Sequence, residues 1–301
     1  MCDIAKGKRV AVLMGGVSAE REVSLNSGKA IAEALRATGY TVHEVDVVDR
    51  ALDLPGDVTA VFVALHGEFG EDGEVQSLLR DRGLPFTGSG VSASQRAFDK
   101  VASKECFAAA GIPTPAYEVL EKGMAPTQPF PLVVKPARQG SSVGIHRIFQ
   151  AEDWPAAFED ALQYDTQILM EQYIEGRELT VGIVDGEALP VLEICAPEGN
   201  YDYRAKYTTG LTSYKVPAPI DAASARECQA LAVQAFEALG CESVARADFR
   251  MNKAGELFIL EVNTIPGFTA TSLLPKAARA AGITFEALCD RIMQSARVSK
   301  D

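Results

Sequence analysis

The chain has few of the residues that build metal centres and disulfide frameworks. It contains three histidines and six cysteines among 301 residues. The cysteines are scattered, with no C-x-x-C pair and no cluster with histidine, so neither a zinc site nor a disulfide framework is expected. We expect buried, reduced thiols instead. Positive charge is also scarce, since the net charge is -12. Nucleic acids and anionic membranes attract clustered Lys and Arg, so neither is expected as the main partner.

Long hydrophobic runs are missing as well. The apolar run at residues 10–14 stops at Gly15-Gly16. It is too short for a signal peptide or a membrane span, and it has the pattern of a buried strand followed by a loop. We therefore expect a cytoplasmic protein. With 47% hydrophobic residues, a chain of this length can bury a sizeable core in two or three domains.

A segment near the C-terminal end has the pattern of a β-hairpin. Residues 246–250 and 258–263 alternate apolar with polar side chains on either side of a Gly-containing turn. Side chains of a strand alternate between its two faces. If the turn pairs Met251 with Glu256, the polar positions of both strands lie on one surface.

That surface would carry four polar groups, namely Arg246, Asp248, Glu261 and Asn263. Hard oxygen ligands in this number suit Mg²⁺ shared with substrate phosphates, because Mg²⁺ keeps waters and rarely takes a full protein cage. The alternative is a solvated hairpin face whose charges keep the sheet soluble.

A second segment is typical of a phosphate site. Residues 130–136 form a β-branched run that ends in Lys135-Pro136, and a loop rich in Gly and Ser separates it from another strand at 145–149. Such a loop offers backbone N–H groups to phosphates while glycine permits a close approach, and Lys135 would add positive charge. Taken alone, a loop of this composition is as readily a simple turn.

The first part of the chain alternates strands with helices. Strands are expected at residues 10–14, 41–47 and 58–64, with helices at 25–37 and 92–110. This rhythm indicates an open parallel sheet, whose binding loops lie beyond the carboxyl ends of the strands. The loops at 15–20 and 66–73 fall there.

After Pro113 strands predominate. Further elements are expected as helices at 155–164, 224–239, 274–281 and 285–296, and as strands at 167–174, 178–184 and 189–194. Residues 196–220 lack a hydrophobic period and predict a long loop. Because long loops in compact domains are often functional lids and this one carries four tyrosines, we expect a lid.

Several motifs in one order resemble the D-alanine:D-alanine ligase family of the ATP-grasp superfamily. Besides the hairpin and the Gly/Ser loop, they are LMGGVSAEREVSL at residues 13–25, Leu65-His66-Gly67 with Glu71-Asp72-Gly73, and YDYRAKY at 201–207. The resemblance extends from about Val10 to about Pro275. It implies an α/β fold, with an N-terminal open parallel-sheet domain followed by an ATP-grasp fold of two α+β subdomains.

The implied domains are an N-terminal substrate-binding domain at residues 1–98, a central ATP-grasp subdomain at 99–182 and a C-terminal catalytic subdomain at 183–301 that carries the lid at 196–220. The implied reaction uses ATP to join two D-alanines through an acyl phosphate, releasing ADP and phosphate, for peptidoglycan precursors of the cell wall. The resemblance also implies a homodimer.

The resemblance assigns the individual roles. Nucleotide contacts fall to Lys100, Lys135, Glu171, Glu178 and Lys206, with the two first lysines on phosphates, Glu171 at the adenine and Glu178 on the ribose. Two Mg²⁺ or Mn²⁺ ions are implied for Asp248, Glu261 and Asn263, with Glu261 bridging both. Substrate roles fall to Glu20 for the first ammonium, Ser272 for the second carboxylate, Arg246 and the Gly267 N–H for an oxyanion, and Ser141 with Tyr207 for a network that joins Glu20 to the lid.

Some positions depart from the family pattern, and some alternatives stay open. Gln139, Gln172 and Thr271 stand where Glu, Lys and His are common. His66 is either a structural histidine or a direct participant. Another ATP-grasp carboxylate-amine ligase is the first alternative, including one that makes D-alanyl-D-lactate or D-alanyl-D-serine, although Tyr207 favours the dipeptide. A dinucleotide-binding module at residues 88–93 is the second, on a weak Gly-x-Gly match.

Overall fold

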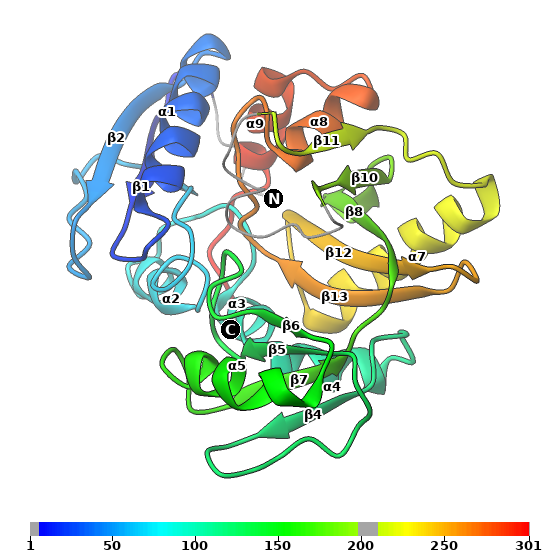
Figure 1. Cartoon of the computed structure of the whole chain (residues 1–301). Coiled ribbons are helices and arrows are strands. Elements are labelled where there is room, and N and C mark those ends of the chain that lie inside the picture. The colour runs from blue at the N-terminus through cyan, green and yellow to red at the C-terminus, as the bar shows by residue number, and fades with distance from the viewer. Residues whose placement is uncertain (1–5, 198–209, 301) are drawn as a thin grey trace.

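The computed structural model describes residues 6–197 and 210–300, and it contains three β-sheets (Figure 1). The first sheet is parallel, with the order β2-β1-β3. Its strands and flanking helices are β1 (Arg9–Gly15), α1 (Arg21–Ala37), β2 (Thr41–Val47), β3 (Ala60–Val63) and α2 (Glu74–Asp81). The parallel sheet expected from the sequence is confirmed. Helix α1 begins four residues earlier than expected, and α2 was not expected.

The helix expected at 92–110 is wrong as a single element. The chain forms α3 (Val91–Phe98) and α4 (Lys100–Ala109), which are separated at Asp99. Asp99 has an extended backbone, and its carboxylate accepts hydrogen bonds from the N–H groups of Val101 and Ala102. An aspartate that caps a new helix in this way satisfies N–H groups that a continuous helix would have bonded internally.

The second sheet is antiparallel and has four strands in the order β4-β7-β5-β6. They are β4 (Tyr117–Leu120), β5 (Leu132–Pro136), β6 (His146–Ile148) and β7 (Ile168–Gln172). A short 3₁₀ turn η1 (Ala151–Asp153) leads into α5 (Trp154–Ala161), which packs on this sheet through Trp154 and Phe158.

The third sheet has the order β11-β10-β8-β12-β13, with β9 paired to β8. Its strands are β8 (Gly176–Val184), β9 (Glu187–Ala188), β10 (Leu192–Cys195), β11 (Ser213–Lys215), β12 (Val244–Asn252) and β13 (Leu257–Asn263). Helix α7 (Ala222–Leu239) packs on it, begins at the capping carboxylate of Asp221 and ends at Gly240, whose φ is +71°. Strand β11 lies in the stretch that the sequence predicted as loop throughout.

The last helices return to the first sheet. Helices α8 (Leu273–Ala280) and α9 (Phe285–Gln294) share a core with α1 and β1, in which Val10 and Ile31 lie with Leu288 and Met293 (Figure 1). The α/β fold class is confirmed. The expected boundary at residues 182–183 falls inside β8, so the division into three domains remains a prediction.

Two sequence predictions concern cysteine and membranes. The five cysteines of the described residues are free thiols, and burial raises the pKa of Cys228 and Cys241 to about 12. In the described part of the chain, no helix has both the length and the apolarity of a membrane span. The prediction of buried, reduced thiols is confirmed for Cys228, Cys241 and Cys289, whereas Cys106 and Cys195 are only partly buried.

Candidate active site

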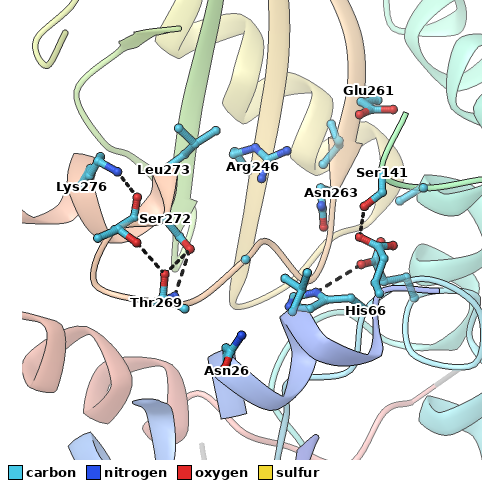
Figure 2. A pocket seen from close by; sticks show the side chains of 18 of the residues that line it. Asn26, His66, Ser141, Arg246, Glu261, Asn263, Thr269, Ser272, Leu273 and Lys276 are labelled. Atoms are coloured by element: carbon cyan, nitrogen blue, oxygen red, sulfur yellow. Dashed lines mark hydrogen bonds and ion pairs between the residues drawn. The ribbon is translucent and has the colours of Figure 1, made fainter. Parts of the chain in front are cut away.

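One cavity brings together residues that lie far apart in the sequence (Figure 2). Its volume is about 530 Å³. Many of the residues that line it were expected in the site from the sequence or its resemblance: Glu20, Lys100, Ser141, Arg246, Glu261, Asn263, Gly267 and Ser272. The fold therefore gathers residues from nearly the whole length of the sequence around one space.

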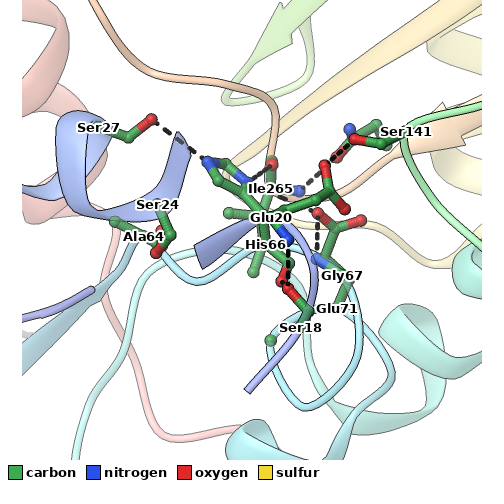
Figure 3. A network of polar contacts seen from close by, with 12 residues as sticks. Ser18, Glu20, Ser24, Ser27, Ala64, His66, Gly67, Glu71, Ser141 and Ile265 are labelled. Carbon is green, nitrogen blue, oxygen red and sulfur yellow. Dashed lines mark hydrogen bonds and ion pairs between the residues drawn. The ribbon is translucent and has the colours of Figure 1, made fainter. Parts of the chain in front are cut away.

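Glu20 forms one end of the cavity. It lies at the N-terminus of α1, and its carboxylate accepts a hydrogen bond from the Ser141 hydroxyl, as expected (Figure 3). Gly67 and Gly140 border the same carboxylate, because a Cβ at either position would lie within 2.9 or 2.8 Å of Glu20 Oε2. The Gly/Ser loop and the His-Gly loop thus close on Glu20 because neither carries a side chain there.

His66 is buried beside Glu20 and is bonded on both ring nitrogens. Nδ1 lies 2.9 Å from the Ile265 carbonyl oxygen and Nε2 lies 3.2 Å from Ser27 Oγ (Figure 3). Since a carbonyl only accepts, Nδ1 carries a proton and donates to it. Ser27 Oγ accepts from the Phe268 N–H and can donate to Nε2. These bonds favour the structural interpretation of His66.

Glu71 approaches the same histidine. Its carboxylate lies 3.6 Å from His66 Nδ1 and accepts from the Gly67 N–H. Burial raises the pKa of Glu71, and the negative charge of Glu20 adds to this effect. Burial opposes protonation of His66, but the hydrogen bond and charge of Glu71 outweigh it, so the pKa of His66 lies above its ordinary value. Both groups hold protons more tightly than usual.

The hairpin of β12 and β13 forms the centre of the site, but with a different register from the expected one. Met251 pairs with Leu257, so the expected pairing with Glu256 is wrong by one residue. The Asn252 side chain accepts from the N–H groups of Ala254 and Glu256 and thereby sets the turn. A one-residue slip alone would turn the carboxylates to opposite faces.

A β-bulge restores the shared face. The register shifts between Asp248 and Phe249, so that Leu260 is the extra residue and Asp248 lies opposite Glu261, with Arg246 opposite Asn263. Bulges of this kind re-aim side chains next to active sites. The common surface that the sequence predicted therefore exists, although two errors in the expected pairing cancel.

The donor groups of this surface are held by neighbours. Asp248 accepts from Arg246 Nε at 2.9 Å, from Arg246 Nη2 at 2.7 Å and from the Thr180 hydroxyl at 2.6 Å. Asn263 Oδ1 accepts from the Ile265 N–H, and Glu261 lies 3.6 Å from the Lys100 ammonium. The acidic groups are thus oriented by cations and by the backbone.

The chemistry of this donor set suits a hard cation. Two carboxylates and a carboxamide oxygen lie on adjacent strands, and Mg²⁺ prefers such oxygen ligands with waters or phosphates completing the shell. Within residues 6–197 and 210–300, no group of three or more His, Cys, Asp or Glu side chains could by itself hold a metal ion. The assignment of Asp248, Glu261 and Asn263 as metal ligands therefore remains a prediction.

A lysine cluster flanks the hairpin. Glu171 is buried on β7 and forms ion pairs with Lys135 of β5 and with Lys104 of α4. Burial opposes ionisation of Glu171, but both lysines outweigh it, so its pKa lies below the ordinary value. Burial lowers the pKa of Lys104. The Glu171 carboxylate therefore faces two ammonium groups, and its expected contact with adenine remains a prediction.

Glu178 also has a partner that the sequence did not predict. It lies on β8 directly opposite Arg250 of β12, and Arg250 donates to its carboxylate at 3.2 Å. Arg250 further donates to the carbonyls of Ile174 and Gly176 and is buried. Arg250 thus holds the Glu178 carboxylate in place, and the expected contact of Glu178 with the ribose remains a prediction.

Other expected positions are also accounted for. Tyr207 and Lys206 lie outside the described residues. Of the three departures, Gln139 and Thr271 line the cavity and Gln172 is exposed. Residues 88–90 are buried in the packed segment that leads into α3, which leaves no open loop for the dinucleotide expected there as an alternative.

The sequence interpretation missed Lys104, Arg250 and Lys276. Lys104 follows Lys100 by four residues on α4, and this spacing places both lysines on one helix face. The spacing could therefore have indicated that Lys104 lies near the phosphate site expected at Lys100. Lys276 lines the cavity from α8. Arg250 shares the strand face of Arg246 and Asp248, but only the pairing with β8 identifies its partner.

Known proteins resemble the chain over its whole length. The family described as D-ala D-ala ligase C-terminus matches residues 106–294, and the one described as D-ala D-ala ligase N-terminus matches residues 48–89. A D-alanine–D-alanine ligase from Syntrophotalea carbinolica is 48% identical and covers 97% of both chains. One from Methylacidiphilum infernorum is 46% identical and covers 95% of both.

A solved structure has the same fold. The crystal structure of a D-alanine–D-alanine ligase from Bacillus anthracis complexed with ATP superposes with a TM-score of 0.86, at 33% identity and over 97% of both chains. Likeness of this extent covers both the parallel sheet and the two antiparallel sheets. The chain belongs to the D-alanine–D-alanine ligase family of ATP-grasp enzymes.

Proposed function

We propose that the chain uses ATP to join two D-alanine molecules into D-alanyl-D-alanine, a precursor of peptidoglycan. The observation that carries the proposal is the cavity with the Glu20 carboxylate at one end and the Arg246, Glu261 and Asn263 side chains of the hairpin beside it. A zwitterionic amino acid can place its ammonium on Glu20 and its carboxylate toward the hairpin. The names of the similar proteins support the same substrate.

In the first step, the carboxylate of the first D-alanine attacks the γ-phosphorus of ATP. A bond forms from the carboxylate oxygen to phosphorus, the bond to the ADP oxygen breaks, and the product is an acyl phosphate. Lys100 and Lys135 offset phosphate charge, while Glu178 binds the ribose hydroxyls and Glu171 lies at the adenine end. ATP binding is supported by the similar Bacillus anthracis ligase, which was crystallised as a complex with ATP.

Asp248, Glu261 and Asn263 would hold two Mg²⁺ or Mn²⁺ ions. The oxygen-only donor set supports this assignment. Such ions neutralise the transferred phosphoryl group so that a weak nucleophile can approach it. Lys100 lies close to Glu261, so the ammonium and the carboxylate would act on the same phosphates.

In the second step, the amine of the second D-alanine attacks the acyl carbonyl and phosphate leaves. Arg246 and the Gly267 N–H stabilise the developing oxyanion, as donors aimed at a forming charge do. Ser272 binds the second carboxylate. Ser141 holds Glu20 and, with Tyr207 of the lid, closes the site so that water does not hydrolyse the acyl phosphate.

A coupled assay of phosphate release tests the proposal. The enzyme is given ATP and Mg²⁺ with D-alanine, L-alanine, D-serine or D-lactate, singly and each with D-alanine, and products are identified by mass. We expect D-alanine alone to support turnover and D-alanyl-D-alanine to be the product. Preferential formation of D-alanyl-D-lactate or D-alanyl-D-serine would instead support the related ligases, and no phosphate release would contradict the proposal.

The homodimer, the cytoplasmic location and the three domain boundaries remain predictions of the sequence and its resemblance. Light scattering on the purified chain measures its mass in solution and so tests the homodimer. Limited proteolysis with and without ATP tests the boundaries, since cleavage is expected between domains rather than within β8.

A further inference from the structure

The cavity has a second charged end opposite Glu20. Lys276 of α8 lines it beside Ser272 (Figure 2). Thr271 and Tyr214 line the same end. The Lys276 ammonium donates to the Thr271 carbonyl and lies 4.4 Å from the centre of the Tyr214 ring. The hydrogen bond and the cation–π contact hold the ammonium beside Ser272.

In the described part of the chain, this ammonium has no carboxylate partner. Among the described residues, no Asp or Glu lies within ion-pair distance of Lys276 Nζ, whereas Lys100, Lys104 and Lys135 each face a glutamate. Burial lowers the pKa of Lys276. A half-buried lysine that is left without an anion in a binding cavity is most simply explained by an anion that the substrate supplies.

We propose that Lys276 is a specificity-determining residue that binds the carboxylate of the amino acid acceptor. The inference rests on the proposed function. Figure 2 shows Ser141, the partner of Glu20, on one side of the cavity and Lys276 on the other, with Arg246 between them. Glu20 takes an ammonium at its end and Lys276 takes a carboxylate at the opposite end. A second zwitterion is thereby oriented with its carboxylate toward Lys276 and its amine toward the carbonyl of the first.

The arrangement also bears on Thr271. Its side chain is neutral, and its backbone carbonyl accepts a hydrogen bond from Lys276. The positive charge at the acceptor end therefore comes from Lys276, in the helix that follows Thr271. Selection by charge predicts that acceptors lacking a carboxylate are rejected, because they leave the ammonium unpaired.

The test is a competition between two acceptors, D-alanine and D-alaninamide, with D-alanine as the only donor. The ratio of D-alanyl-D-alanine to D-alanyl-D-alaninamide is measured by mass spectrometry. We expect the wild-type enzyme to prefer D-alanine and Lys276→Met to lower the ratio at least about tenfold, with the KM for ATP kept within about twofold. Lys276→Gln serves as a second neutral variant, and Lys276→Arg should restore the preference.

Two comparisons separate this role from a structural one. Arg279→Met removes a neighbouring exposed charge of the same helix outside the cavity, and it should leave the ratio unchanged. D-lactate retains a carboxylate, so its competition with D-alanine should not respond to Lys276→Met. An unchanged amide ratio in both neutral variants overturns the inference alone, whereas a wild-type enzyme that joins no D-alanine overturns the proposed function and the inference with it.

Discussion

Replacing Glu171 with glutamine should destabilise the protein in a way that depends on pH. The Glu171 side chain is 1% exposed and pairs with Lys104, which is fully buried, and with Lys135. Glutamine has the same size but no charge, so two ammonium groups are left close together. Removing one partner from a buried ion pair costs about 3–5 kcal/mol of stability.

An upper limit follows from the titration of Lys104. A buried lysine can always lose its proton, and each unit of pKa corresponds to about 1.4 kcal/mol. Relative to an unfolded pKa of about 10.4, neutralising one lysine costs at most about 5 kcal/mol at pH 7 and about 2 kcal/mol at pH 9. Lys104 is the group that releases the proton, since burial already lowers its pKa.

The sign of the pH dependence is therefore fixed. Between the folded and unfolded pKa values of Lys104, the folded variant binds fewer protons than the unfolded chain, so its free energy of unfolding rises with pH. The difference between wild type and Glu171→Gln should shrink from about 3–5 kcal/mol at pH 7 to about 2 kcal/mol at pH 9.

The assay uses the single tryptophan of the chain. Trp154 packs in the same core as Met170, the residue before Glu171, so its fluorescence in urea reports unfolding of this sheet. Glu175→Gln is the matched control, because its pair with Lys253 is exposed on both sides and should matter little. A loss of stability that is equal at pH 7 and pH 9 would refute the reasoning.

Three further predictions concern the reaction. Glu261→Gln should lower the turnover number much more than it lowers the urea midpoint of unfolding, because the charge that would bridge the two metal ions is lost. Near-normal dipeptide synthesis by this variant across a Mg²⁺ titration would contradict the two-metal assignment. Arg246→Lys keeps the charge but loses the planar fork, so kcat should fall roughly 100- to 1000-fold with ATP binding kept; failure through weak ATP binding alone would make Arg246 a nucleotide residue. Tyr207→Phe should relax the choice of acceptor toward D-lactate, and an unchanged product ratio would mean that the hydroxyl does not set specificity.

Local patterns predicted the elements better than their junctions. Hydrophobic periodicity located most strands of the three sheets and most helices, because burial of one face imposes it, but it missed β4 and β11. The break at Asp99 depends on a hydrogen bond that caps α4 inside an otherwise helical pattern. Helix α2 begins after a glycine with a positive φ, and the segment before it has the composition of a binding loop. Neither signal is periodic, so periodicity could not find them.

The site was predictable where its residues lie close together in the sequence. The hairpin carries Arg246, Asp248, Glu261 and Asn263 on one face, and alternation suffices to find that face, although the bulge at Leu260 leaves no signal in the sequence. Lys104 and Arg250 were missed because their partners, Glu171 and Glu178, lie on strands that are distant in the sequence. Such pairs follow from sheet topology, which single-sequence patterns do not contain.

The spacing between the Glu20 end of the cavity and the segment that follows β13 depends on two buried contacts between distant parts of the sequence. The segment after β13 carries Gly267, and His66 and Ser27 of the N-terminal part bind its backbone at Ile265 and Phe268. The same His66 belongs to the loop that closes on Glu20. Because His66 lies in the loop beside Glu20 and also binds the segment that carries Gly267, loosening it would change the separation of the proposed ammonium site and the proposed oxyanion donor, while every proposed substrate contact stays in the chain.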